Sequence, residues 1–184
     1  MTDRVVLKEG VEMLFLNIYS HIRVLCKLLI YKLLFWGKVS FSSHIHFRRG
    51  FSLLVLEHGK VEIDRYVFFN NECSIVSREY VFIGAYTMMG ENVKIYDHNH
   101  SISSPDIMKR DQGFRKRPIR VGQNCWIGNN VTLLGGADIG DNSVIGAGCI
   151  IDCVIPANMI VTMNRDLQMV PISWKNRGAV LEAK

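Results

Sequence analysis

The sequence predicts an all-β solenoid with an N-terminal helical segment and one extruded loop. Three observations predict this fold: a six-residue period of aliphatic residues, glycine and asparagine at fixed places in that period, and one long polar interruption of it. The chain has 184 residues, of which 48% are hydrophobic and 21% charged. This composition supplies enough apolar material for a core and excludes a wholly disordered or collagen-like chain.

Residues 1–38 are predicted to form a helical segment, with the helix over residues 11–36. On a helical wheel the polar side chains gather on one side, although Lys32 lies off that stripe. Two roles stay open for the helix. It caps the solenoid and packs on a neighbouring subunit, which is the preferred interpretation, or it makes a peripheral contact with an anionic membrane.

Residues 39–164 carry the repeat, and residues 165–184 are assigned to a C-terminal tail. A period of six fits neither a helix nor a plain strand, because it requires a corner in every hexad. Three hexads then make a triangular coil of eighteen residues, in which Val121 stacks beneath Ile139 and Ile127 beneath Ile145. A sandwich or barrel with evenly spaced turns is the alternative. The aliphatic positions are Val121, Ile127, Leu133, Ile139, Ile145 and Ile151, and the hexads continue through Thr162.

The same period extends upstream with two irregularities. Glu57 breaks it, and two extra residues enter near Ser77–Arg78. Residue types that tolerate left-handed backbone are expected at the corners, as at Asn124, Asn130, Asp141 and Asn142. The upstream aliphatic and aromatic positions are predicted at Val39, Ile45, Phe51, Ile63, Phe69, Ile75, Ile83, Met89 and Ile95.

The stretch from Ile119 to Ile150 contains hexads such as Ile-Gly-Asn-Asn-Val-Thr and Ile-Gly-Asp-Asn-Ser-Val. It resembles the hexapeptide-repeat acyltransferase superfamily, of the maltose, galactoside and surface-polysaccharide O-acetyltransferase type, and the resemblance covers residues 39–162. This resemblance implies a left-handed parallel β-helix, a homotrimer with sites at the subunit interfaces, and acetyl-CoA as donor.

The repeat is interrupted by a polar loop over residues 98–118, and long loops in compact domains are commonly functional. Two histidines stand at its start, and an imidazole is suited to remove the proton of an attacking hydroxyl. The position that matches the family's histidine is His100, which is therefore the predicted catalytic base in direct transfer. His98 is a candidate contact to the acceptor. Asp97 either orients an imidazole or caps the turn, and both stay open.

The resemblance also implies residues that bind the two substrates. Asn70 matches an acceptor-binding asparagine, with a left-handed corner residue as the alternative, and Glu72 stands where related enzymes carry a shorter polar residue. Trp126 matches a tryptophan beside the cofactor arm, or it is a surface or interface residue. Small residues in the coils would let pantetheine approach the backbone. These cofactor-binding candidates are Gly128, Gly146, Ala147 and Gly148, with Arg165, Lys175 or Arg177 for the CoA phosphates in place of the family's usual lysine.

The resemblance therefore implies an acetyl-CoA-dependent O-acetyltransferase that acts on a sugar hydroxyl in bacterial capsule, exopolysaccharide or lipopolysaccharide biosynthesis. The acceptor is a free, nucleotide-linked, lipid-linked or polymeric saccharide, and no metal is required. Three alternatives stay open: an N-acetyltransferase of an amino sugar nucleotide, a metal-dependent lyase of the carbonic-anhydrase type with His98 and His100 as ligands, and a non-catalytic trimeric scaffold.

Charge and cysteine content bear on location and partners. Residues 1–38 hold six basic and three acidic groups, and residues 101–118 hold five and two, so the positive charge lies in two short segments. No nucleic-acid motif accompanies it, whereas an anionic acceptor would suit the basic loop. The five cysteines are scattered and odd in number, which favours a reducing compartment. We expect a cytoplasmic protein, with the inner face of the plasma membrane as the place of any peripheral contact.

Overall fold

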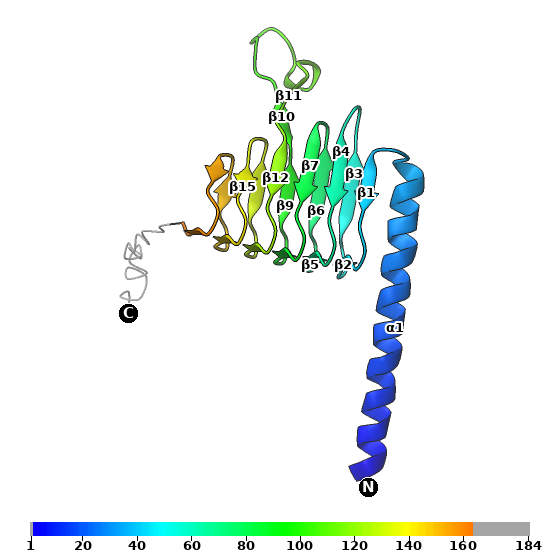
Figure 1. Ribbon diagram of the computed structural model, residues 1–184. Coiled ribbons are helices and arrows are strands. Elements are labelled where there is room, and N and C mark those ends of the chain that lie inside the picture. Colours follow the sequence, from blue (N-terminus) through cyan, green and yellow to red (C-terminus); the bar gives the residue numbers. More distant parts are fainter. Residues whose placement is uncertain (1, 164–184) are drawn as a thin grey trace, which may run out of the picture.

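The computed structural model describes the backbone of residues 2–163 and the side chains of residues 18–163. A long helix, α1 (Thr2–Leu34), lies across one end of a parallel β-solenoid (Figure 1). It begins earlier and ends slightly earlier than the predicted range of 11–36. Gly37, with φ +72°, follows it and provides the left-handed residue that commonly ends a helix. The predicted tail, with Arg165, Lys175 and Arg177, lies outside the described residues.

Three parallel sheets form the sides of the solenoid. The first sheet contains β1 (Val39–Phe41), β4 (Lys60–Ile63), β7 (Tyr80–Ile83), β12 (Ile119–Val121), β15 (Asp138–Ile139) and β18 (Val154–Ile155). The second contains β2 (His46–Phe47), β5 (Phe68–Phe69), β8 (Met88–Met89), β13 (Trp126–Ile127), β16 (Val144–Ile145) and β19 (Ile160–Val161). The third contains β3 (Ser52–Val55), β6 (Ser74–Ser77), β9 (Lys94–Tyr96), β14 (Thr132–Leu134) and β17 (Ile150–Ile151). The fold is thus the predicted β-helix.

The predicted stacking is confirmed in the later coils. Val121 pairs with Ile139 and Ile127 with Ile145, and all four side chains are buried. Each sheet contributes such a column to the interior, and the first sheet adds a second one at Val61, Val81 and Ile119, so the core is a narrow prism of aliphatic and aromatic side chains. Burial of these columns is the main stabilising contribution to the fold.

In the first coil the predicted columns were wrong by two residues. Phe41, Phe47 and Leu53 pair with Ile63, Phe69 and Ile75, so they take the places predicted for Val39, Ile45 and Phe51. Val39 instead pairs with Val61, in the neighbouring column of inward positions. The cause is an enlarged corner between β3 and β4, which a strict period of six cannot accommodate.

Each coil has three corners. The first corner joins the first sheet to the second, the second corner joins the second sheet to the third, and the third corner joins the third sheet to the first sheet of the next coil. Successive column residues are six apart across every first and second corner. At the third corner the step varies from coil to coil. It is ten residues from Leu53 to Ile63, eight from Ile75 to Ile83, twenty-six from Ile95 to Val121, six from Leu133 to Ile139, and four from Ile151 to Ile155. The predicted unbroken run of hexads to Thr162 therefore ends early, because the last third corner is two residues short.

The first and second corners are held by left-handed residues that stack from coil to coil. Asn124 donates to Asn142 at 2.9 Å, and Asn92 donates to Asn130 at 2.8 Å. Asp141, predicted as a left-handed residue, is not among those with positive φ and instead accepts the Gln123 N–H at 2.9 Å. The left-handed residues other than glycine are His44, Tyr66, Tyr86, Asn124, Asn142 and Asn158 at first corners, Glu72, Asn92 and Asn130 at second corners, and Glu57 at a third corner.

The predicted loop leaves the solenoid at the third corner and projects away from it (Figure 1). Its base is an antiparallel ribbon of β10 (His98–His100) and β11 (Phe114–Lys116), which we call the stem. A short 3₁₀ helix, η1 (Lys109–Asp111), lies near the tip. Among the described residues, no helix has the length and hydropathy of a membrane span.

Candidate active site

The two histidines of the stem lie on the same face of the ribbon. In the stem His98 pairs with Lys116 and His100 with Phe114, and residues two apart in a strand share a face. The ring of Phe114 lies between them, with ring-centre distances of 5.4 Å to His98 and 4.6 Å to His100. This face, defined by His98, His100, Phe114 and Lys116, is called the imidazole face. It places the two imidazole rings on one face of a two-stranded ribbon.

Asp97 fixes the base of the stem from inside the protein. Its carboxylate is fully buried and accepts the Ser77 hydroxyl at 2.6 Å and the N–H groups of Arg78 and Glu79, each at 2.8 Å. The same carboxylate bonds the Nδ1 atom of His98 at 2.9 Å. Asp97 therefore does both things that the sequence left open: it orients an imidazole and it holds the turn. Because Asp97 has no exposed surface, its side chain cannot contact the acceptor directly.

A charged network supports the imidazole face from the neighbouring coils. The Arg78 guanidinium lies 3.7 Å from the centre of the Phe114 ring and forms an ion pair with Glu57. Glu57 also pairs with Lys116 of the stem. The hydrogen bond from Lys116 is the main cause that lowers the pKa of Glu57, and the charges of Lys116 and Arg78 add to it. Both ion pairs of Glu57 are at the surface, so they contribute more to the position of the stem than to the stability of the fold.

Sequence reasoning did not assign Glu57, Ser77, Arg78 or Phe114 to the site. The signals were present as irregularities, because Glu57 breaks the hexad period and Ser77–Arg78 is the two-residue insertion. Both irregularities occur at third corners, directly beneath the stem. The residues that interrupt the pattern are thus the ones that hold the stem in place.

His100 lies further along the stem and is exposed. Its neighbour within the chain is the Phe114 ring, whereas His98 is held by Asp97. The outward part of the imidazole face therefore offers His100 to whatever molecule or subunit lies against the stem.

The predicted cofactor-binding residues form a separate groove of about 260 Å³ on the second sheet. Trp126 is 55% exposed and lines this groove with Gly128, Gly146 and Ala147. Gly148 is not among the lining residues. The other lining residues are Asn129, Val144, Ile145, Ile160 and Thr162.

The two glycines of the groove also serve the stacking of the coils. The N–H groups of Gly128 and Gly146 are already donated to Ile145 and Val161 of the next coil, each at 2.7 Å. A Cβ atom at Gly128 would lie 2.7 Å from the Ala147 nitrogen. These glycines therefore permit close stacking of the coils, and their N–H groups are not free for pantetheine.

Asn70 and Glu72 lie at the second corner between β5 and β6. The Oδ1 atom of Asn70 accepts the Asn71 N–H at 2.9 Å. The left-handed residue of this corner is Glu72, with φ +59°, so the alternative of a left-handed Asn70 was wrong. Glu72 is exposed, and its carbonyl accepts the Lys94 ammonium at 2.7 Å.

One chain does not bring the predicted catalytic and cofactor-binding residues together. His98 and His100 rise from the third corner, and the second sheet, which carries Trp126, is the side of the triangular coil opposite that corner. A site that uses His100 and Trp126 together therefore has to be built from two copies of the chain.

The basic residues of the loop separate into three environments. Lys116 is engaged by Glu57, and Lys109 and Arg110 lie exposed near the tip. Arg115 and Arg117, on the other face of the stem, line a pocket of about 220 Å³ with Asn99, Leu134, Gly135 and Asp152. This pocket is a polar recess beside the stem, and the sequence did not predict it.

Thiols and metal ligands add little to the site. Within the part of the chain that the structure describes, no group of three or more His, Cys, Asp or Glu side chains is arranged to hold a metal ion. All five cysteines are free, and burial raises the pKa of the Cys73 and Cys125 thiols.

Comparison with known proteins supports the family. Residues 118–155 match the family model described as bacterial transferase hexapeptide (six repeats). A curated relative named for O-acetyl transfer in lipopolysaccharide biosynthesis, WbbJ of Escherichia coli K12, is 31% identical over 132 residues. This alignment covers 68% of the present chain and 67% of WbbJ.

Sugar-modifying enzymes are among the other relatives. The galactoside O-acetyltransferase of Lactococcus lactis is 36% identical over 94 residues, which cover 51% of this chain and 44% of that enzyme. The present chain thus spans less than half of that relative. A solved galactoside acetyltransferase in complex with coenzyme A superposes with a TM-score of 0.55 at 29% identity, covering 65% of this chain and 60% of that one.

Proposed function

This chain belongs to the hexapeptide-repeat acyltransferase family, and we propose that it transfers an acetyl group from acetyl-CoA to a hydroxyl group of a saccharide. The observation that carries the proposal is the stem, which presents His100 on a face supported by residues of the two preceding third corners. The relatives named as O-acetyltransferases support the choice of a hydroxyl acceptor.

We assign the donor to the groove beside Trp126. The exposed indole suits contact with a flexible thioester arm, and the apolar lining suits its methylene groups. The coenzyme A complex of the related galactoside acetyltransferase supports this donor class. Because the N–H groups of Gly128 and Gly146 are engaged, Ala147 is the corner residue that we expect to offer a backbone N–H to the donor.

The chemistry is direct transfer in a ternary complex. The imidazole of His100 accepts the proton of the acceptor hydroxyl while that oxygen attacks the thioester carbonyl, and the C–S bond then breaks. The imidazolium returns a proton to the departing thiolate. The Asp97–His98 pair holds the stem in position during these steps, and Asn70 or Glu72 contacts the acceptor.

We propose a homotrimer with its sites between subunits. The opposite locations of His100 and Trp126 support an assembly in which the stem of one copy reaches the groove of the next. Such a head-to-tail contact forms a closed ring when its rotation closes, and three copies would give three equivalent sites.

The acceptor is proposed to be a building block of a bacterial surface polysaccharide, in line with the naming of WbbJ. A cytoplasmic location fits this proposal, because acetyl-CoA is available there. Acetyl transfer onto free, nucleotide-linked and polymeric sugars, with amino sugar nucleotides included, would identify the acceptor and distinguish O-acetylation from N-acetylation.

The decisive experiment removes the proposed base. We expect His100→Ala to lower acetyl transfer by ~10²–10⁴-fold, because no other group would accept the hydroxyl proton at that position. The measurement is release of free CoA with each acceptor, alongside the mass of the assembly by light scattering. His44→Asn is the matched control, since His44 is an exposed histidine at a first corner.

Two outcomes would overturn the assignment. Full activity of the folded His100→Ala variant would exclude His100 as the base. A larger loss for His98→Ala than for His100→Ala would transfer the role to the imidazole that Asp97 orients. Absence of acetyl-CoA turnover with every acceptor would contradict the proposed function itself.

A further inference from the structure

Helix α1 packs on the solenoid through a mixed side, in which Val24, Leu28 and Tyr31 join the core and Arg23 and Lys27 donate hydrogen bonds. The first coil has no coil before it, so its outward backbone groups need other partners. Arg23 donates to the Phe47 carbonyl at 3.2 Å, and Lys27 donates to the Phe51 carbonyl. The Tyr31 hydroxyl accepts the Leu53 N–H at 3.1 Å. Burial lowers the pKa of Lys27, in keeping with its position between the helix and the coil.

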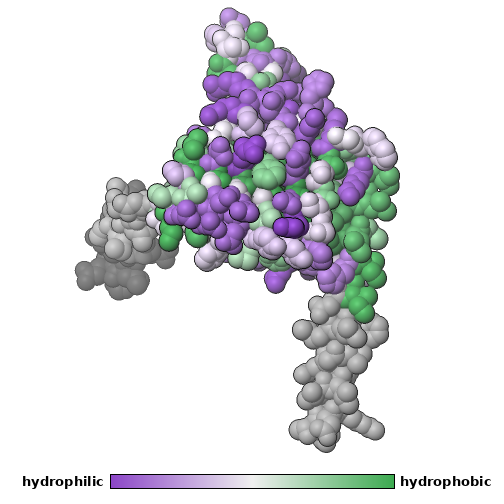
Figure 2. All heavy atoms as spheres, viewed as in Figure 1, coloured by the Kyte–Doolittle hydropathy of each residue, from purple (hydrophilic) through white to green (hydrophobic). Residues whose placement is uncertain are grey.

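The side of α1 that faces away from the solenoid is apolar. Val24 and Tyr31 are buried against the coil, and on a helical wheel Ile22, Leu29 and Leu33 lie opposite them, each more than half exposed. Figure 2 shows a band of hydrophobic surface along this edge of the molecule. The large exposed apolar side chains of the helix and its end, which we call the outer face, are Ile18, Tyr19, Ile22, Leu25, Leu29, Ile30, Leu33, Leu34 and Trp36.

An ordinary surface helix has its apolar residues on the side that covers the core, whereas α1 carries further large apolar residues on its outward side. Contiguous apolar surface of this kind marks a contact with a membrane or another macromolecule. The charges around the outer face discriminate between these occupants. From Met13 to Leu56 the chain contains no Asp or Glu. The same segment contains six cations: Arg23, Lys27, Lys32, Lys38, Arg48 and Arg49.

The positive charge favours an anionic lipid surface over a second copy of the chain. Two copies stacked through their outer faces would bring two cationic ends together, and this contact is repulsive. Anionic headgroups attract the exposed cations of this segment, Lys32, Arg48 and Arg49. Aromatic residues of the kind enriched at membrane interfaces also border the outer face, since Trp36 is 81% exposed at the end of the helix and Tyr19 lies near the other end of the described part.

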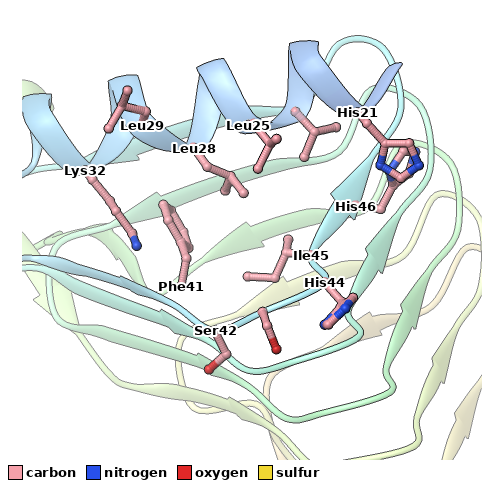
Figure 3. A pocket seen from close by; sticks show the side chains of 12 residues that line it. His21, Leu25, Leu28, Leu29, Lys32, Phe41, Ser42, His44, Ile45 and His46 are labelled. Carbon is pink, nitrogen blue, oxygen red and sulfur yellow. The ribbon is translucent and has the colours of Figure 1, made fainter. Parts of the chain in front are cut away.

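A groove beside the helix continues the apolar surface. It encloses about 610 Å³ between α1 and residues 41–46, and Leu25, Leu29 and Lys32 line it together with Phe41 and Ile45. Figure 3 shows Lys32 reaching from the helix toward Phe41, with the His21 ring over His46 at the other end. The apolar floor suits an acyl chain, and the ammonium of Lys32 suits a phosphate headgroup.

We propose that the α1 end of this protein docks on an anionic bilayer, with the helix lying in the plane of the interface and its outer face in contact with lipid. The helix lies across the end of the solenoid, so a flat surface can meet the outer face without touching the coils (Figure 1). The solenoid then stands away from the membrane. This interaction is independent of the acetyl transfer proposed above.

Binding of the full chain to vesicles tests the proposal. The probes are vesicles of phosphatidylcholine alone and of phosphatidylcholine with about 30% phosphatidylglycerol, at low salt. The readout is the fraction of the protein that floats with the vesicles. We expect binding to the anionic vesicles only. Double replacement Ile22→Glu with Leu29→Glu should lower the partition coefficient by about tenfold or more, because both side chains lie in the outer face. Ile150→Glu is the matched control, an exposed isoleucine in β17 at the far end of the solenoid.

The charges are tested separately from the apolar surface. Arg48→Gln with Arg49→Gln should lower binding about fivefold per removed cation, whereas Lys109→Gln with Arg110→Gln, two exposed cations near the loop tip, should leave it unchanged. Failure of the wild-type protein to bind anionic vesicles would overturn the proposal. So would an assembly mass that halves in the Ile22→Glu, Leu29→Glu variant, because the outer face would then be covered by a second copy.

Discussion

The first and second corners of the coil differ from the third in both regularity and chemistry. Steps across the first two corners are always six residues, and left-handed residues recur there, with asparagine side chains hydrogen-bonded between neighbouring coils. Steps across the third corner range from four to twenty-six residues. Glu57, Arg78, Asp97 and the stem all lie at third corners.

The comparison shows how a periodic fold gains an individual site. Three sheets and two corners supply the repeating hydrogen bonds and the packed columns, so the coils keep their stacking while the third corner varies in length. Insertions at that edge cost little because both neighbouring strands keep their register. Function-bearing residues can then accumulate along one line of the molecule.

A cavity in the regular part should have the largest effect on stability. Ile139→Ala is expected to lower the free energy of unfolding by about 2–5 kcal/mol, because Ile139 is a buried column residue of β15. Denaturant unfolding followed by circular dichroism measures this change. The folded variant should keep the KM and kcat of the wild-type protein. A selective loss of kcat would contradict the view that the regular coils serve stability and the third corners serve function.

Disturbing the third corner should instead affect turnover. Asp97→Asn places an amide NH₂ against the N–H groups of Arg78 and Glu79 or against the Ser77 hydroxyl, so the stem loses its anchor. We expect kcat to fall by about tenfold or more while the KM for acetyl-CoA stays constant, since the donor groove lies on another side. Trp126→Ala should give the converse result, a raised KM for acetyl-CoA. Equal changes of KM in both variants would argue against separate sites on the chain.

The smallest effect is expected from the surface ion pairs of the stem. The pKa of Glu57 is lowered in the folded protein, so its contribution is present above the ordinary glutamate range and is lost as the pH falls through the lowered value. Glu57→Gln should raise hydrogen exchange of the Phe114–Lys116 amides about two- to fivefold near neutral pH, and wild type and variant should converge in acid. Glu91→Gln, at a second corner, is the control and should leave the stem amides unchanged.

The periodicity of the later coils could be predicted in detail because each step there is six residues. The predicted positions were wrong in the first coil, where Phe41 takes the place predicted for Val39. The corner after β3 contains four extra residues, and nothing in the six-residue pattern marks them. The roles of Glu57 and Arg78 depend on contacts between coils and the stem. These contacts join residues far apart in the sequence, so the hexad pattern does not predict them.

The orientation of α1 also could not be obtained from the sequence. The wheel separates a polar from an apolar side, but it does not say which one meets the solenoid. The usual expectation places the apolar side inward. Here the free carbonyls of Phe47 and Phe51 need donors, and Arg23 and Lys27 supply them. These hydrogen bonds, together with the packing of Val24 and Leu28 on the core, fix the orientation of the helix.

The way α1 covers the first coil has a consequence for the length of the molecule. A parallel solenoid could in principle elongate without limit, since each new coil regenerates the edge on which the next one adds, as in a growing fibre. Side chains that satisfy the Phe47, Phe51 and Leu53 backbone groups end this propagation at one pole. The helix therefore acts as a terminator of head-to-tail polymerisation, and it does so without adding a strand.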